Sequence, residues 1–197
     1  MINPPRPCGA LTATYHGDML DHVALLVPSI EAAAAALGSL RAERGPVEEF
    51  PSEGTREMYI GAPGTGGRLL LLQPMGASGP YARAMAKRGP GLHHIAYRVA
   101  DIDTFIDAHP GWLLHPISLK THPRSATAWF ARPGIPILLE VVTNPDPLTG
   151  PDLTSAIQIP VAPECTAMTE RLEIRGGPAR MSLEGRDVSI KSLVTGS

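Results

Sequence analysis

Two histidines and one glutamate stand out in this 197-residue chain because their types and surroundings could hold a metal ion. His22 and His94 each open a short apolar, alternating segment, and Glu140 lies inside the apolar run of residues 137–142. A carboxylate in such a run is costly to bury unless something compensates its charge. Imidazole and carboxylate ligands together suit a divalent first-row metal with open coordination positions. The three residues therefore predict a metal site, provided that the fold brings them together.

The elements that must position the histidines form an internal repeat. Residues 22–30 align without a gap with residues 94–102, and residues 58–64 align with residues 128–134. Each copy predicts a strand, a helix and two or three further strands. A sheet this short cannot bury its faces alone, so we expect the two copies to pack together.

The helices of the two copies begin with matching signals. Ser29 and Asp101 each follow the first strand of their copy, and each precedes an acidic residue in the first helical turn. Short side chains with an oxygen at this place are typical helix N-caps. We therefore predict one helix after Ser29 and an equivalent helix after Asp101.

Alternation along a strand decides which way the histidines face. In residues 22–27, bulky Val and Leu side chains at alternate positions share one face, and His22 lies on the other. The second copy follows the same pattern around His94. The bulky face should pack under the helix, so the histidine face should line the space that the two copies enclose. His93 has the opposite parity, and the repeat assigns the inward position to His94.

The bulk composition is that of an ordinary globular protein, with 43% hydrophobic and 18% charged residues. A net charge of −2 gives no sign of a nucleic-acid or anionic-membrane surface. No apolar run reaches membrane-spanning length, and the N-terminus lacks a secretory signal. The only cysteines, Cys8 and Cys165, fit a reducing compartment. We expect a cytoplasmic protein with a small-molecule substrate and neither a nucleic-acid nor a membrane partner.

The pattern divides the chain into three parts. Residues 1–18 are Pro-rich and unpatterned, and we interpret them as a flexible arm. Residues 19–146 hold the paired modules, at about 19–75 and 91–146, which predict an α+β domain of two βαβββ units. Residues 147–197 fall outside the repeat and predict a linker followed by a C-terminal β extension.

Within the extension, two segments have the pattern of strands. Residues 157–161 form one such segment, and residues 179–194 predict a pair of strands with a turn at residues 184–186.

The double module resembles the vicinal oxygen chelate superfamily, which includes glyoxalase I, extradiol dioxygenases, bleomycin resistance proteins and methylmalonyl-CoA epimerases. The likeness is greatest to the epimerases and spans about residues 19–144. It rests on the segments LDHVALLVPSIEAA, SGPYARAMAKRGPGLHHIAYRVADID and PILLEVV. The resemblance implies that the modules form a curved mixed sheet around a cleft with a metal site, and that the protein is a homodimer.

The resemblance also implies a ligand set. His22, His94 and Glu140 match three metal-ligand positions of the family, for a divalent ion that could be Co, Mn, Ni, Zn or Fe. The epimerases have a fourth ligand, Glu or Gln, where this chain has Leu70, which is also the repeat equivalent of Glu140. Leucine cannot bind a metal, and the nearby Gln73 has the opposite strand parity.

Three functions remain open from the sequence. The first is a metal-dependent epimerase or isomerase that removes a proton alpha to a carbonyl of a carboxylate-bearing acyl compound, such as a CoA thioester. The second is an Fe(II) extradiol-type dioxygenase with a 2-His-1-carboxylate triad. The third is a non-catalytic protein of the same fold that binds a small molecule.

Epimerisation needs acid and base groups on both sides of the substrate carbon. The resemblance implies that Glu140 is one of them, and Glu57 is the candidate for the other. The family position falls nearer Met58 when counted back from the following Ala-Pro, and Glu53 and Glu49 are the alternatives to Glu57. The same acidic segment is also typical of a solvated loop.

A basic segment could bind the phosphates of a CoA ester. Its cations are Arg83, Lys87 and Arg88. The alternative interpretation is a solvent-facing helix end, where cations interact favourably with the helix dipole.

Overall fold

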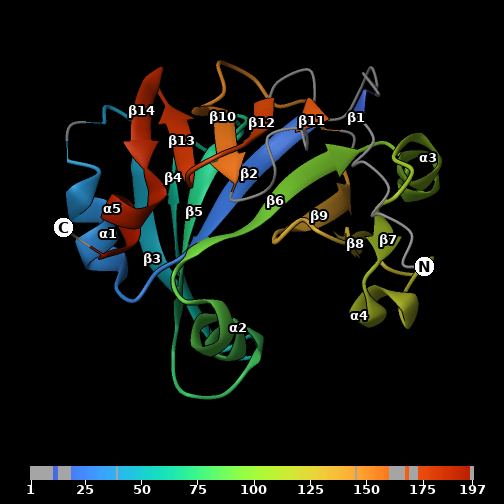
Figure 1. The fold of residues 1–197 in the computed structure, drawn as a ribbon, viewed down its shortest axis with the longest axis horizontal. Coiled ribbons are helices and arrows are strands. Elements are labelled where there is room, and N and C mark those ends of the chain that lie inside the picture. The colour runs from blue at the N-terminus through green and yellow to red at the C-terminus, as the bar shows by residue number, and fades with distance from the viewer. Residues whose placement is uncertain are drawn as a thin grey trace, which may run out of the picture.

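The computed structural model describes residues 11–12, 19–38, 40–144, 146–159, 167–168 and 173–195. Figure 1 shows one large sheet, a smaller sheet beside it and short helices around both. Of the predicted arm, only β1 (Leu11–Thr12) is described, and it pairs with β11 (Ala167–Met168). The rest of the arm lies outside the described residues. In the part of the chain that is described, no helix is long and apolar enough to cross a membrane.

The large sheet is built from two copies of the same unit. The first copy consists of β2 (Met19–Leu26), α1 (Ile30–Ala36), β3 (Arg44–Phe50), β4 (Thr55–Ile60) and β5 (Arg68–Pro74). The second consists of β6 (Gly91–Val99), α3 (Ile102–Ala108), β7 (Leu113–Leu114), the short α4 (Pro116–Leu119), β8 (Thr127–Ala131) and β9 (Leu138–Thr143). Helix α2 (Pro80–Arg88) connects the copies. The predicted α+β fold of paired βαβββ modules is confirmed.

The two modules join edge to edge through their first strands. The order of the eight strands is β3-β4-β5-β2-β6-β9-β8-β7, with β2 and β6 antiparallel at the centre. In the register of this pair, His22 lies opposite Ala96, and His94 lies opposite Ala24. Each histidine therefore faces the small residue of the other copy, which leaves room for both imidazoles on one face.

The two faces of the sheet have different roles, as the strand alternation predicts. Val23, Leu25 and Ile95 are fully buried in the main core, which also contains Ile30 of α1 and Phe105 of α3. The opposite face carries a smaller apolar cluster, formed by Ala24, Leu26, Leu70, Leu72 and Tyr81. The histidines lie on this second face, away from α1 and α3.

Both predicted N-caps are confirmed. The Ser29 hydroxyl accepts a hydrogen bond from the backbone N–H of Ala32 at 3.1 Å. The Asp101 carboxylate accepts one from the N–H of Thr104 at 2.7 Å. Each cap satisfies an N–H at the start of its helix and fixes where the chain turns back over the sheet.

The C-terminal extension covers the helix-bearing face of the large sheet. Its strands are β10 (Thr154–Ile159), β12 (Glu173–Gly176), β13 (Arg180–Leu183) and β14 (Arg186–Ser189), and the sheet order is β1-β11-β12-β10-β13-β14. Ile157, Met181 and Leu183 are buried in the main core together with the inner residues of β2 and β6. The extension therefore completes the core and leaves the histidine face open.

Residues 179–194 are predicted to form two strands, and this prediction is wrong for residues 190–194. The turn at Glu184 and Gly185 is present, but α5 (Ile190–Thr195) is a helix. Its buried residues Ile190, Leu193 and Val194 have helical spacing, and α5 packs beside α1. Packing against α1 thus decides the conformation of a segment whose alternation alone favours a strand.

We predict that Leu193→Ala destabilises the whole domain, because Leu193 is 2% exposed in the shared core. The expected loss is about 2–5 kcal/mol in the free energy of unfolding, measured by urea denaturation. Ser192→Ala, on the exposed side of the same helix, is the control and should change stability by less than about 0.5 kcal/mol. Equal stability of the Leu193→Ala and wild-type proteins would show that α5 is not part of the core.

Candidate metal centre

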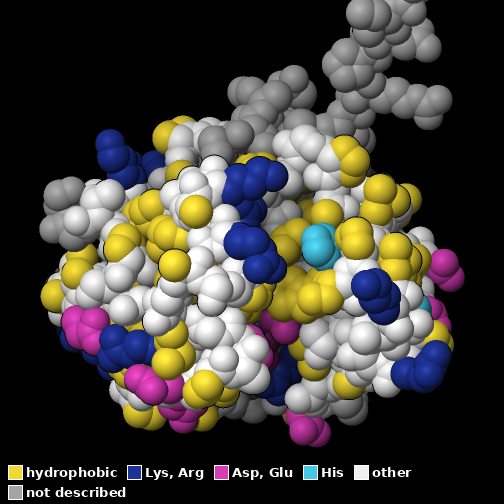
Figure 2. Space-filling model, turned by 90° about the horizontal axis from the view of Figure 1, so that it is seen from below, with side chains coloured by type: hydrophobic (Ala, Val, Ile, Leu, Met, Phe, Trp, Pro, Cys, Tyr) yellow, Lys and Arg dark blue, Asp and Glu magenta, His cyan; other side chains and the backbone are white. Residues whose placement is uncertain are grey.

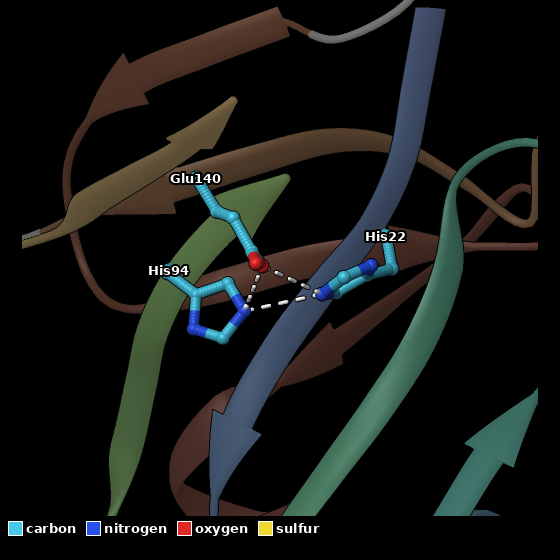
Figure 3. Close-up of side chains that lie close together, drawn as sticks. All are labelled: His22, His94 and Glu140. Carbon is cyan, nitrogen blue, oxygen red and sulfur yellow. Dashed lines mark hydrogen bonds and ion pairs between the residues drawn. The ribbon is translucent and has the colours of Figure 1, made fainter. Parts of the chain in front are cut away.

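Three side chains from three strands converge on the open face of the sheet. His22 comes from β2, His94 from β6 and Glu140 from β9, and Figure 3 shows their polar atoms pointing toward one another. The Nε2 atoms of the two histidines are 3.1 Å apart. The Glu140 Oε2 atom lies 3.4 Å from the His94 Nε2 and 3.7 Å from the His22 Nε2. The fold thus brings together the three residues that the sequence singles out as ligands.

These distances fit the ligand set of one metal ion. Two ligand atoms bound at about 2.1 Å are about 3.0 Å apart at a right angle and about 3.4 Å apart in a tetrahedron. The three separations lie close to this range. His22 and His94 are 6% and 2% exposed, so their inward nitrogens meet little water. A carboxylate beside two buried imidazoles is a donor set that a divalent cation would satisfy.

Asp21, which the sequence pattern did not single out, orients His22. The Asp21 Oδ1 atom accepts a hydrogen bond from the His22 Nδ1 at 2.8 Å, which leaves the lone pair on the inward Nε2. Arg98 and Arg68 also donate to the same carboxylate. Burial by itself would raise the pKa of Asp21, but its hydrogen bonds and its attraction to His22 and Arg98 outweigh burial and lower it. The signal was available, because Asp21 directly precedes His22 in the sequence.

His93 lies beside His94 and also faces the open side of the sheet, although its parity predicted the opposite face. The pairing of β6 with β2 is irregular at this residue, so the simple alternation does not hold there. The Nδ1 atoms of the two rings are 2.8 Å apart. One of them must therefore donate and the other accept. When His94 binds a metal through Nε2, its Nδ1 carries the proton and His93 is the acceptor. Burial lowers the pKa of His93 to about 3, and the nearby charges of His94 and Arg88 act in the same direction. His93 is therefore neutral over the physiological range, as an acceptor must be.

The electrostatics of Glu140 favour its charged form. Burial acts to raise the pKa of this carboxyl, but its interactions with His94 and His22 outweigh burial and lower it. Burial lowers the pKa of His94, in spite of the adjacent Glu140. The cluster therefore pairs an ionised carboxylate with an imidazole that is held neutral, which is the protonation that metal ligands require.

The cluster lies in a cleft of about 700 Å³ on the open face of the sheet. Figure 2 shows this hollow from below, with apolar and acidic side chains inside it and Lys and Arg side chains along one side. Leu70, Leu72, Tyr59, Tyr81 and Trp129 contribute to its lining. The Trp129 and His94 ring centroids are 4.9 Å apart. Apolar side chains therefore form much of the wall around the candidate ligands.

Glu57 is the acidic residue of β4 that faces this cleft. It pairs with Leu72 across β4 and β5, whereas its neighbour Met58 packs toward the main core. Burial raises the pKa of Glu57, although the Thr55 hydroxyl donates a hydrogen bond to it at 3.0 Å. Of the two alternatives, Glu53 also lines the cleft, and Glu49 is exposed and lies 3.8 Å from Arg56.

The position of the missing fourth ligand is apolar. Leu70 is 3% exposed, lines the cleft and pairs with Ala24 in the register of β2 and β5. Gln73 does not replace it, because its Oε1 atom accepts a hydrogen bond from the backbone N–H of Ile30 at 2.9 Å. Within the described residues, the protein side chains that converge here as candidate ligands are therefore the two histidines and Glu140.

The three basic residues of α2 are exposed, but they differ in position. Arg83 and Arg88 line the cleft, while Lys87 is not among its lining residues. Arg88 also donates a hydrogen bond to the backbone carbonyl of Pro136 at 3.1 Å.

We predict that Asp21→Asn weakens binding of a divalent metal about 10- to 100-fold, because His22 loses the carboxylate that orients it. Co²⁺ titration followed by visible absorption measures the change. Asp103→Asn is the matched control, since Asp103 contacts His122 at 2.9 Å elsewhere on the protein. Unchanged affinity in Asp21→Asn would show that Asp21 does not act through His22.

We also predict a loss of stability in acid that depends on His93. Its pKa falls from 6.5 to about 3 on folding, so the unfolded chain binds the proton first as the pH falls. The contribution of His93 to the free energy of unfolding is therefore fully present above about pH 6.5. It decreases below this pH, by at most about 1.4 kcal/mol per pH unit for this one group. Urea denaturation between pH 7 and pH 5, in the presence of chelator, should show a smaller decrease for His93→Gln. The same decrease in both proteins would contradict the prediction.

Known proteins are similar to part of this chain. Residues 21–111 match the family model of the Glyoxalase/Bleomycin resistance protein/Dioxygenase superfamily. An ethylmalonyl-CoA/methylmalonyl-CoA epimerase of Cereibacter sphaeroides is 41% identical over 85 residues, which are 42% of this chain and 62% of that protein. The chain thus matches less than two thirds of the length of this curated relative.

Solved structures share the fold. A hypothetical protein from Bacillus halodurans C-125 superposes with a TM-score of 0.52 at 26% identity, over 68% of this chain and all of that one. A methylmalonyl-CoA epimerase in complex with methylmalonyl-CoA and NH4+ gives a TM-score of 0.50 at 22% identity, with the same coverage. Residues 21–111 therefore match the glyoxalase/bleomycin resistance protein/dioxygenase superfamily, and the chain shares the fold of these solved structures.

Proposed function

We propose that this protein is a divalent-metal-dependent epimerase of a carboxylate-bearing acyl-CoA, acting at the carbon alpha to the thioester carbonyl. One observation carries the proposal: His22, His94 and Glu140 converge in the same cleft that Glu57 faces from another strand. The similarity to the Cereibacter sphaeroides epimerase supports the reaction class and the CoA thioester. His22, His94 and Glu140 would hold the metal.

A bound divalent metal supplies positive charge that stabilises the negative charge developing on the substrate oxygens. Asp21 and His93 keep the two imidazoles in the orientation and tautomer that this role needs. Leu70 and Trp129 keep water away from the acidic carbon, which strengthens these interactions.

The acid and base of the reaction would be Glu57 and Glu140. In the order of the sheet, β5, β2 and β6 separate β4, which carries Glu57, from β9, which carries Glu140. The two carboxyls therefore approach the cleft from different sides, as removal and return of a proton on opposite faces require. Their environments differ, since the pKa of Glu57 is raised and that of Glu140 is lowered. Carboxyl groups whose pKa values are moved apart can divide acid and base work.

We predict that Glu57→Gln lowers the rate at which one epimer of the substrate exchanges its α-proton with solvent about 100-fold or more, because the general acid/base on that side is lost. Deuterium incorporation from D₂O into ethylmalonyl-CoA or methylmalonyl-CoA, followed by mass spectrometry, measures this rate. Glu53→Gln is the matched control, being an acidic residue of the same cleft on an exposed turn. Exchange at the wild-type rate in Glu57→Gln would reassign the second base.

Metal removal tests the other half of the proposal. Treatment with chelator should abolish the exchange, and Co²⁺, Mn²⁺, Ni²⁺ or Zn²⁺ should restore it in the wild type but not in a His22→Ala/His94→Ala variant. Full activity of the metal-free protein would refute the metal dependence.

Leu70 favours a second candidate, because a site with three protein ligands leaves positions for both a substrate and O₂. Turnover of a catechol that depends on Fe(II) and O₂ would support this dioxygenase. The similarity to epimerases makes it the less supported candidate. The homodimer stays a prediction.

A further inference from the structure

A second cavity, of about 570 Å³, lies between the loop that joins α2 to β6 and the C-terminal extension. Its volume is within the range of small-molecule sites. Most of its lining is apolar, and both the large sheet and the extension contribute to it. The apolar side chains include those of Leu92, Ile137, Ile159, Ala179, Ile190 and Val194.

This cavity is distinct from the cleft of the candidate metal centre. Its extension side is formed by Ala179 and by residues of β10 and α5, none of which lines the cleft. His93 and Arg88 line both spaces, so the two are neighbours that share part of one wall. The proposed acyl-CoA epimerisation uses the cleft and leaves this cavity without a role.

Two cations lie on the cavity lining. Arg88 and Lys191 are both exposed, and they come from α2 and α5 respectively. Arg88 donates to the carbonyl of Pro136, and among the described residues neither cation forms an ion pair with a carboxylate. A wall of apolar side chains with two such cations is complementary to a ligand that has an alkyl chain and an anionic end.

We propose that this cavity binds an unbranched alkyl carboxylate, with the chain among Ile159, Ala179 and Val194 and the carboxylate beside Lys191. The polarity of the lining favours an alkyl chain over the pantetheine arm of CoA. Pantetheine carries two amides that lose hydrogen bonds on burial unless partners replace the water. Gln158 is the sole side-chain amide on the described lining. An alkyl chain needs no hydrogen-bond partners there, whereas the two amides of pantetheine would need them.

Isothermal titration of the full chain with decanoate tests the proposal. We expect saturable binding that Ala179→Phe weakens at least 10-fold by filling the cavity. Lys191→Glu should weaken it several-fold and does not depend on core packing, since Lys191 is exposed. Lys120→Glu, on the exposed end of α4, is the matched control and should leave the dissociation constant unchanged. Thermal unfolding of each variant confirms that it is folded.

Four results would contradict the proposal. Absence of binding to the wild type removes the site. Equal affinity of the wild type and both cavity variants would place decanoate elsewhere, such as in the cleft. Tighter binding of pantetheine than of decanoate, with the same sensitivity to Ala179→Phe, would assign the cavity to the CoA arm. Decan-1-ol should bind more weakly than decanoate, and equal binding would refute the role of Lys191. None of these measurements depends on epimerase activity.

Discussion

The antiparallel pairing of β2 with β6 is the constraint on which the candidate site depends. It places His22 opposite Ala96 and Ala24 opposite His94, so the two imidazoles meet on one face without a clash. A shift of one residue in the register of either strand would place its histidine on the opposite face, in the helix-bearing core. The same pairing joins the two repeats into a single sheet, so fold and site rest on one set of backbone hydrogen bonds. The position of Glu140 also depends on this pairing, because β9 pairs with β6 in a fixed register.

Burial of these polar groups is possible because each has a partner. Asp21, held by two arginines, orients His22, and His93 contacts the outer nitrogen of His94. A buried imidazole or carboxylate without a partner would destabilise the fold. The Nε2 atoms of His22 and His94 and the Glu140 Oε2 atom therefore face one another as candidate ligands of one cation. The Nδ1 atoms of the two histidines contact Asp21 and His93.

The C-terminal extension makes the two faces of the large sheet different. It covers the helix-bearing face, where α5 packs beside α1, and leaves the cleft face open. In doing so it also encloses the second cavity next to His93. One appended element thus completes the core and forms the proposed ligand site beside the proposed catalytic one.

The sequence alone determined the features that arise from local periodicity. The repeat, the facing of His22 and His94, and the caps at Ser29 and Asp101 all follow from residue types a few positions apart. The tertiary structure decided what depends on contacts between distant segments. The role of Asp21 requires arginines from β5 and β6, the cleft-facing position of Glu57 requires the register of β4 with β5, and the helical form of α5 requires α1. The alternation of a strand determines which face a side chain lies on. The pairing of strands and the packing of helices determine which residues it contacts there.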